Sequence, residues 1–189
     1  MSRKAIIICA PSGAGKTSIV RYLLDALPYL AFSVSACSRP KRENETDGKD
    51  YYFLTADEFR SRIEAGGFVE WEEVYPGSYY GTLKSELERI WKENRIPIFD
   101  VDVNGGVSLK KYFGSDSLAI FIRPPSLEIL ESRLRNRGTE TGESLKKRLG
   151  RAGFELGFAG KFDLDIINED LEKACREAVD AIVRFLEEK

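Results

Sequence analysis

The chain has 189 residues, which is enough for one sizeable hydrophobic core and too few for two independent domains. Its 42% hydrophobic and 32% charged residues are typical of a globular protein, and no apolar run approaches the ~18 residues of a membrane span. The net charge of −2 gives no general affinity for nucleic acid or acidic membranes, and the lack of histidine excludes histidine bases and histidine metal ligands.

Three cysteines, Cys9, Cys37 and Cys175, are widely separated in the chain. They lack the paired spacing of a metal site, and an odd number does not fit a complete disulfide framework. A strand is predicted within four residues of the N-terminus, which leaves no room for a cleavable signal peptide. We therefore expect free thiols in a reducing cytosol, and a cytoplasmic protein.

The first predicted unit is a strand, a turn and a helix. Residues 4–9 are apolar and rich in β-branched side chains, as in a parallel strand covered on both faces. Residues 10–17, Ala-Pro-Ser-Gly-Ala-Gly-Lys-Thr, contain the turn, and apolar residues recur at helical spacing over positions 19–27 until Pro28. This order is typical of a phosphate-binding loop.

The chemistry of residues 10–17 supports that interpretation. Gly13 and Gly15 allow backbone N–H groups to point inward, and the following helix adds its positive end. Lys16 can bridge the outer phosphates, and Thr17 can offer its hydroxyl to Mg²⁺. Ala10 stands where the usual pattern has its first glycine, which is acceptable if its φ is negative. A glycine-rich turn without a ligand is the alternative.

Residues 33–82 are predicted to form a small β-rich insertion between core elements. Its strand-like runs are residues 32–36, 51–54, 68–71 and 79–81. Thr55 and Glu58 have the spacing of a capping box, so a helix is expected over 57–65, ending at two glycines.

After this insertion, helical and apolar strand-like segments alternate. Helices are expected around positions 83–91, 127–134, 145–156 and 171–185, and strands at 96–102, 118–122 and 164–167. The glycines between 150 and 160 would each cost roughly 1 kcal/mol inside a helix, so we expect that segment to be bent or mobile. The alternation predicts an α/β fold with a mostly parallel sheet covered by helices on both faces. Ligands then bind at the carboxyl ends of the strands.

Several polar residues are candidates for a second ligand site. Arg39 and Arg42, with Tyr51 and Tyr80, could hold a second phosphate, because arginine binds phosphate through paired donors. A solvated basic loop is the alternative. Glu70 could accept from the adjacent N1–H and N2–H₂ donors of guanine, whereas adenine would present an acceptor. An exposed sheet carboxylate is the alternative for Glu70.

Two further groups of charges have both a functional and a structural interpretation. Asp100 and Asp102 lie two apart in a predicted strand and so share a face, where they could organise Mg²⁺-bound water, contact a base or simply be solvated. The arginines of two successive helices could close on phosphates or form a charged surface: Arg133, Arg135, Arg137, Arg148 and Arg151. Phosphoryl transfer needs such charge neutralisation more than a covalent residue.

These motifs, in this order, resemble the guanylate kinase family, whose members pass phosphate from ATP to GMP. The resemblance covers nearly the whole chain. It is carried by the segments 11–17, 33–35, 39–42, 47–51, 68–71, 79–82, 100–102, 137–140 and 168–170.

The resemblance implies a P-loop kinase fold with a GMP-binding insertion and a helical lid, all within a single domain of residues 1–189. The core is then expected at about 1–32, 83–125 and 161–189, the GMP-binding region at about 33–82, and the lid at about 126–160. It also implies reversible, Mg²⁺-dependent and direct in-line transfer of the ATP γ-phosphate to GMP, giving ADP and GDP.

The resemblance also assigns roles to individual residues. The ATP-binding residues are expected to be Ala10, Pro11, Ser12, Gly13, Ala14, Gly15, Lys16, Thr17, Arg133, Arg137 and Asn168. The GMP-binding residues are expected to be Ser35, Arg39, Arg42, Tyr51, Glu70, Tyr80, Thr82 and Asp102. The residues expected to act in catalysis are Lys16, Arg39, Arg133, Arg137 and Arg148. Mg²⁺ is expected to bind Thr17 directly and Asp100 through water.

Other functions stay open at this point. A binding module similar to the guanylate-kinase-like domains of scaffold proteins is one, although Lys16 and Thr17 are intact here. A related kinase acting on a phosphorylated sugar is another, which would not need the set of Glu70, Thr82 and Asp102. We expect GMP and ATP as partners, and neither nucleic acid nor membrane. The sequence leaves open the use of dGMP and whether the chain is a monomer or a homo-oligomer.

Overall fold

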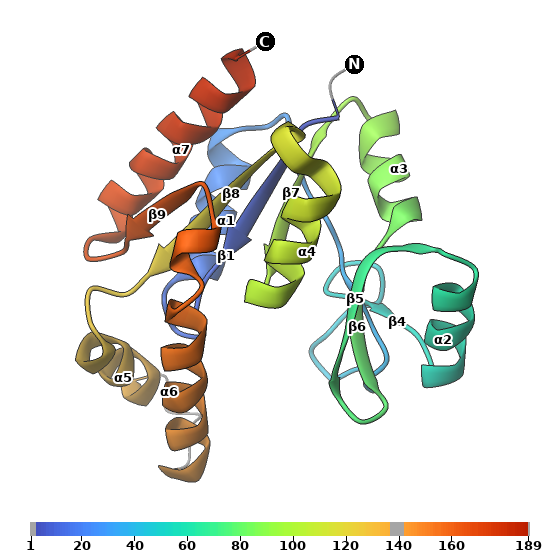
Figure 1. The fold of residues 1–189 in the computed structure, drawn as a ribbon, viewed down its shortest axis with the longest axis horizontal. Coiled ribbons are helices and arrows are strands. Elements are labelled where there is room, and N and C mark those ends of the chain that lie inside the picture. Colours follow the sequence, from blue (N-terminus) through green and yellow to red (C-terminus); the bar gives the residue numbers. More distant parts are fainter. Residues whose placement is uncertain (1–2, 137–141, 189) are drawn as a thin grey trace.

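A parallel sheet of five strands forms the centre of the computed structural model, which describes residues 3–136 and 142–188 (Figure 1). The strand order is β2-β7-β1-β8-β9, and each neighbouring pair is parallel. The strands are β2 (Leu30–Phe32), β7 (Ile96–Val101), β1 (Ala5–Cys9), β8 (Ser117–Arg123) and β9 (Leu164–Ile167). This arrangement confirms the predicted α/β fold.

Helices cover both faces of this sheet. Every residue of β1 is consequently buried, and every one is apolar. Ile6 and Ile8 pack toward α1 (Lys16–Ala26) and α7 (Leu171–Glu187) on one face. Ile7 and Cys9 pack on the other, toward α3 (Lys84–Lys92) and α4 (Val103–Phe113). Alternate residues of a strand point to opposite faces, so the continuous apolar run predicts two cores. All three cysteines are free and buried, as expected.

A second, smaller sheet lies beside the core and corresponds to the predicted insertion (Figure 1). Its order is β4-β3-β6-β5, with β4 (Tyr52–Phe53), β3 (Ala36–Cys37), β6 (Ser78–Leu83) and β5 (Phe68–Tyr75). Helix α2 (Ala56–Glu64) begins at Thr55 with the predicted capping box, and its Phe59 stacks between Phe68 and Tyr79. The predicted strand at 32–36 is divided, because Phe32 ends β2 in the core and Ala36 begins β3 in the second sheet.

One buried carboxylate connects the second sheet to the core. Glu86, in α3, is 2% exposed and accepts hydrogen bonds from the backbone N of Val34 at 3.0 Å and from the hydroxyl of Tyr52 at 2.8 Å. Arg89 completes its partners with an ion pair of 2.8 Å. Val34 lies in the segment that leaves the core, and Glu86 lies just after the segment that returns to it. Glu86 therefore fastens both connections at one point.

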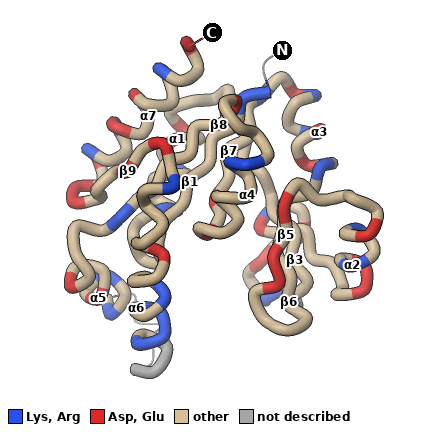
Figure 2. The backbone as a smooth tube through the Cα atoms, viewed as in Figure 1, with Lys and Arg blue, Asp and Glu red and all other residues tan. Residues whose placement is uncertain are grey.

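A pair of helices, α5 (Leu127–Asn136) and α6 (Gly142–Leu156), projects from the core away from the second sheet (Figure 1). Leu130 and Leu134 of α5 pack against Leu145 and Ala152 of α6 in a small core of their own. Helix α6 continues without interruption through two of its glycines, at positions 150 and 153. Figure 2 shows basic positions along α6, on one side of the molecule, and acidic positions along β5, on the other.

Helix α4 is the main element that the sequence patterns did not indicate. Its first turn contains Asn104, Gly105 and Gly106, which interrupt the helical spacing of apolar residues from which a helix is predicted. Gly106 is needed there because an added Cβ would lie 2.1 Å from the sulfur of Cys9. The start of α4 also corrects the predicted strand at 96–102, since β7 ends at Val101 and Asp102 is instead the N-cap of α4.

Candidate functional site

The loop between β1 and α1 has the backbone conformation that a phosphate-binding loop needs. Gly13 and Gly15 have φ values of 92° and 98°, a region that strongly favours glycine. Space also requires glycine, because an added Cβ would lie 2.8 Å from Leu134 at position 13 and 2.3 Å from Asn168 at position 15. Among the described non-glycine residues, Asn94 alone has a positive φ, so Ala10 fulfils the condition set for it.

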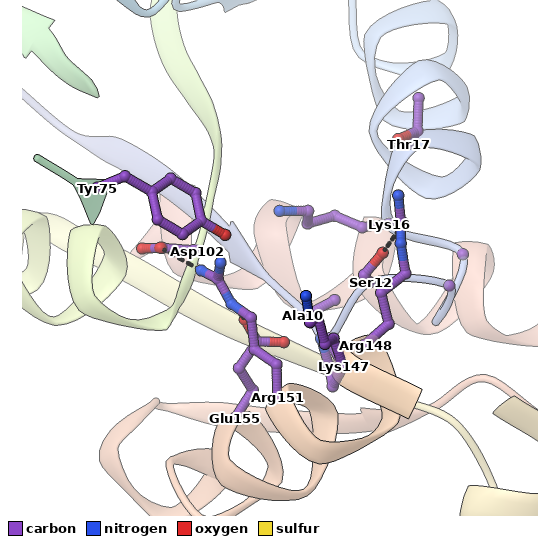
Figure 3. A pocket seen from close by; sticks show the side chains of 13 residues that line it. Ala10, Ser12, Lys16, Thr17, Tyr75, Asp102, Lys147, Arg148, Arg151 and Glu155 are labelled. Atoms are coloured by element: carbon purple, nitrogen blue, oxygen red, sulfur yellow. Dashed lines mark hydrogen bonds and ion pairs between the residues drawn. The ribbon is translucent and has the colours of Figure 1, made fainter. Parts of the chain in front are cut away.

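A pocket of about 480 Å³ lies over this loop (Figure 3). Seven of the eight residues 10–17 line it; Ala14 is fully buried beneath. Side chains of α6 form the opposite wall: Lys147, Arg148, Arg151 and Glu155. Arg148 donates a hydrogen bond of 2.9 Å to the hydroxyl of Ser12. The structure thus brings a basic helix face over the predicted phosphate loop.

Lys16 lies at the carboxyl end of β7. Its ammonium forms an ion pair of 2.6 Å with Asp100 and donates a hydrogen bond of 2.8 Å to the carbonyl oxygen of Val101. Thr17 lines the same pocket and is exposed, so its hydroxyl can reach a ligand. The described residues contain no cluster of three or more acidic, cysteine or histidine side chains suited to a metal ion.

A second pocket of about 330 Å³ opens between the core and the second sheet. Five of the eight predicted GMP-binding residues line it: Ser35, Tyr51, Glu70, Tyr80 and Asp102. Thr82 is 1% exposed and lies directly behind this wall, where its hydroxyl donates a hydrogen bond of 2.7 Å to Glu70. Four side chains line both pockets, so the two share a wall: Lys16, Tyr75, Asp102 and Arg151.

The carboxyl group of Glu70, in the second pocket, has a raised pKa. Burial raises its pKa to about 7, and the negative charges of Asp102 and Glu72 act in the same direction. The hydrogen bonds from Thr82 oppose this shift because they stabilise the carboxylate. Glu70 is therefore held near its neutral–ionised midpoint at neutral pH, and a ligand that donates hydrogen bonds to it will favour the ionised form.

The two predicted phosphate-binding arginines, Arg39 and Arg42, do not line this pocket, although Arg39 contacts a residue that does. Arg39 stacks over Tyr51 with a distance of 5.0 Å from its guanidinium carbon to the ring centre, and both of its terminal nitrogens donate to Glu45 at 2.6 Å. This pairing lowers the pKa of Glu45 to about 2. Arg42 is exposed, and its backbone N also donates to Glu45, at 2.9 Å.

Glu45 was not singled out from the sequence. It lies in an irregular polar loop, where no periodic pattern shows which carboxylate meets which arginine. Three other residues that line the first pocket were also not singled out: Tyr75, Lys147 and Glu155. Tyr75 reaches the pocket only because the β5–β6 hairpin brings it there, which depends on tertiary structure.

Two of the remaining predicted ATP-site residues, Asn168 and Arg133, bond to other parts of the chain and do not line the first pocket. Asn168 is 3% exposed, and its side-chain nitrogen donates to the carbonyl oxygen of Ala14 at 2.7 Å, so it braces the phosphate loop from below. Arg133 donates to the carbonyl oxygen of Asn168 at 2.9 Å. Arg137 lies outside the described residues.

The chain is similar to known proteins over nearly its whole length. A family model described as guanylate kinase matches residues 2–185. The guanylate kinase of Porphyromonas gingivalis is 53% identical over 184 residues, which is 97% of this chain and 98% of that protein. The guanylate kinase of Thermotoga maritima is 45% identical over 184 residues, which is 97% of this chain and 87% of that protein.

Solved structures give the same result for the fold. The crystal structure of guanylate kinase from Anaplasma phagocytophilum superposes with a TM-score of 0.74 at 27% identity, covering 100% of this chain and 89% of that chain. A shikimate kinase from Bacteroides thetaiotaomicron, at a TM-score of 0.50 and 14% identity over 97% of this chain and 98% of that chain, shares the fold alone.

Proposed function

Because the chain belongs to the guanylate kinase family and is therefore an enzyme that phosphorylates GMP with ATP, we propose that the two pockets hold these two substrates. ATP binds over residues 10–17, and GMP binds between the core and the second sheet. The observation that carries this assignment is the shared wall, since Lys16, Asp102 and Arg151 line both pockets. Two substrates placed there meet with their phosphates together, as direct in-line transfer requires.

In the ATP site, the positive groups of the loop and of α6 bind the phosphates. The N–H groups of the loop and the start of α1 surround the inner phosphates, and Lys16 and Arg148 neutralise the outer ones. Arg133 and Arg137 are proposed to join them when the lid, about residues 126–160, moves toward the core. Lys16 then exchanges its ion pair with Asp100, at 2.6 Å, for phosphate oxygens or shares it with them.

The donor set is suited to Mg²⁺, which prefers oxygen ligands and keeps several of its waters. Thr17 would hold the ion directly through its exposed hydroxyl, and Asp100 would hold one of its waters. When bound, the ion neutralises charge on the phosphates that are transferred. No other role is assigned to it.

In the GMP site, the carboxylates read the base and the basic groups hold the phosphate. Ionised Glu70 accepts from the N1–H and 2-amino donors of guanine, while Thr82 fixes its orientation from behind. Asp102 and Ser35 complete the contacts with the base. The phosphate is held by the side chains of Arg39, Arg42, Tyr51 and Tyr80. Adenine would leave Glu70 facing an acceptor, which disfavours AMP.

The chain's own residues then act by orientation, charge neutralisation and exclusion of water. The lid and the GMP-binding region, about residues 33–82, close over the substrates, which limits hydrolysis of ATP. A phosphoenzyme is not part of the proposed mechanism, because no activated nucleophile is seen among the residues lining the pockets. We also infer a cytoplasmic location, because buried free thiols suit a reducing compartment. Within the described residues, no helix has the length and apolar character needed to cross a bilayer.

The test is a nucleotide assay with purified protein and Mg-ATP. ADP formation is measured with GMP, AMP or CMP as acceptor, and GDP is identified directly. The proposal expects rapid ADP formation with GMP alone. Equal rates with the three acceptors, or none with GMP, would contradict it.

A further inference from the structure

Arg151 lies where the two pockets meet and connects α6 with the N-terminus of α4. One of its terminal nitrogens, Nη2, donates to Oδ2 of Asp102 at 3.0 Å, and its Nε donates to Oε1 of Glu155 at 2.9 Å. Figure 3 shows Arg151 and Glu155 projecting from the same helix, with the guanidinium extended toward Asp102 and the ring of Tyr75 beside it. A residue of its own helix, Glu155, thus orients the guanidinium, which reaches the N-terminus of α4.

Asp102 is held on both of its oxygens. Its Oδ1 caps α4 by accepting from the backbone N of Gly105 at 2.9 Å, and its Oδ2 accepts from Arg151. The cap fixes the position of one oxygen, and the ion pair with Arg151 then sets the direction of the other. Asp102, which is proposed to contact the base, is therefore oriented by a side chain of α6.

The charge in the GMP pocket gives Arg151 a second effect. Four carboxylates line this pocket: Glu70, Glu72, Asp100 and Asp102. Among the described residues that line it, Lys16 and Arg151 are the basic ones, and Lys16 is already paired with Asp100. Arg151 consequently supplies the positive charge beside Asp102, in a pocket that must accept an anionic nucleotide.

Helix α6 contacts both substrate sites through one face. Arg148 and Arg151 are three residues apart, so they project from the same side of the helix. Arg148 reaches Ser12 in the phosphate loop, and Arg151 reaches Asp102 in the GMP pocket. A movement of α6 therefore alters both sites together.

We propose that Arg151 is a positioning residue for guanine recognition, which directs Asp102 toward the 2-amino group of the base and offsets its charge. This proposal rests on the proposed function, because it takes the second pocket as the GMP site. It makes GMP affinity depend on the position of α6. The proposal identifies the 2-amino group as the feature that Asp102 recognises. IMP tests this, since it has the same N1–H and lacks the 2-amino group.

The test compares Arg151→Met and Arg151→Lys with wild type, using Arg176→Ala as the matched control. Arg176 is an exposed arginine of α7 whose partner is Glu172, and it lines neither pocket. The quantities measured are kcat and KM for GMP, IMP and ATP, and the melting temperature of each variant.

The methionine variant is expected to raise KM for GMP about tenfold, the loss of one charge-assisted hydrogen bond, with kcat changed less than about threefold. Its preference for GMP over IMP falls at least about threefold, because Asp102 no longer points reliably at the 2-amino group. The lysine variant keeps the charge and restores most of the GMP affinity. The Arg176→Ala control behaves as wild type.

Two results would overturn the inference. If wild type is selective for GMP and Arg151→Met keeps its KM and its preference over IMP, the ion pair with Asp102 has no role in recognition. If kcat falls at least about a hundredfold with KM unchanged, Arg151 acts on the reacting phosphates instead. A wild-type enzyme that accepts AMP as readily as GMP would instead overturn the proposed function itself. If the methionine variant fails to fold, Arg151→Gln, which also removes the charge but keeps a polar side chain, decides by the same selectivity measurement.

Discussion

The hydroxyl of Thr82 donates a hydrogen bond of 2.7 Å to Oε1 of Glu70, and the two residues lie opposite each other on strands β6 and β5. This bond stabilises the ionised carboxyl group, whereas burial and the charges of Asp102 and Glu72 favour the protonated one. The balance holds the pKa of Glu70 at about 7, inside the range where the enzyme's pH dependence can be measured.

We predict that KM for GMP rises as the pH falls below 7. In the proposed complex, guanine donates two hydrogen bonds to ionised Glu70, so a protonated carboxyl group must first lose its proton. Below a pKa of about 7, this cost weakens binding by up to about tenfold per pH unit. An arginine stays charged throughout this range, so Arg151 beside the pocket does not contribute to the change. KM would be measured between pH 5.5 and about 8.5, a range that spans this pKa.

The control for this pH dependence is Glu70→Gln, which cannot ionise. Its profile should keep only the dependence that arises from the phosphate of GMP, whose second pKa is about 6. The variant should also bind GMP more weakly, because one acceptor becomes a donor. A wild-type KM that is constant from pH 6 to about 8, or equal profiles for both proteins, would contradict the assignment of Glu70.

Lys16→Ala is predicted to reduce turnover by at least about a hundredfold, because a charge that contacts the transferred phosphate is lost. Its fold should persist, since the ammonium lies in a pocket and not in the core. Circular dichroism and kcat measured on the same sample would show both effects. An active variant would disprove the proposed role of Lys16.

Glu45→Gln is predicted to raise KM for GMP about threefold to tenfold with little change in kcat, because Arg39 loses a charge-assisted pair that holds it in place. Glu43→Gln is the matched control, since Glu43 is an exposed carboxylate in the same loop. A lower KM in Glu45→Gln would show instead that Glu45 competes with the phosphate for Arg39.

Gly15→Ala is predicted to lose more stability than Gly77→Ala. Both glycines have positive φ, at 98° and 76°, so each substitution imposes roughly 1–2 kcal/mol of backbone strain. At position 15 the new Cβ would also lie 2.3 Å from the side chain of Asn168, whereas nothing lies within 4 Å at position 77. Urea titration would compare the two. Equal losses would show that Asn168 moves away without cost.

Ala10→Gly is predicted to leave KM for ATP within about twofold of wild type and to lower stability by at least about 0.4–1 kcal/mol. Ala10 has no positive φ, so the alanine is unstrained; glycine adds freedom to the unfolded chain and also removes a methyl group that is buried in the core. Melting curves and ATP kinetics would test both parts. A large gain in ATP affinity would show that the methyl group obstructs the phosphate loop.

The sequence predicts the parts of this structure that depend on local pattern. The apolar run of β1, the capping box at Thr55 and the glycines of the phosphate loop each follow from spacing and residue type. The sequence predicted roughly which residues form the second sheet. It did not predict that residues 33–35 separate a strand of the core from a strand of the second sheet. Alternation within one strand does not show that the chain changes sheets.

Site residues could be predicted when they belong to recognisable sequence motifs. They could not be predicted when their partners depend on tertiary contacts. Glu70 and Thr82 come together because β5 pairs with β6, and these strands include the predicted strand-like runs at 68–71 and 79–81. Glu45 and Tyr75 lie in a loop and at the end of a hairpin strand, and their positions depend on long-range packing. The inward direction of Asn168 is of the same kind, because it arises from a contact with Ala14, 154 residues away.

The buried Glu86 limits how the proposed GMP site can move. Its carboxylate accepts from Val34, in the segment that leaves the core, and from Tyr52, in the second sheet, and it lies on a helix that begins directly after the return. A pivot of the second sheet about this point keeps both bonds, whereas sliding along the core would break them and leave the buried carboxylate only its ion pair with Arg89 of the same helix among these partners. A pivot also carries Glu70 and Thr82 as one rigid pair, so the proposed geometry for recognising the base is assembled before the second sheet approaches α6.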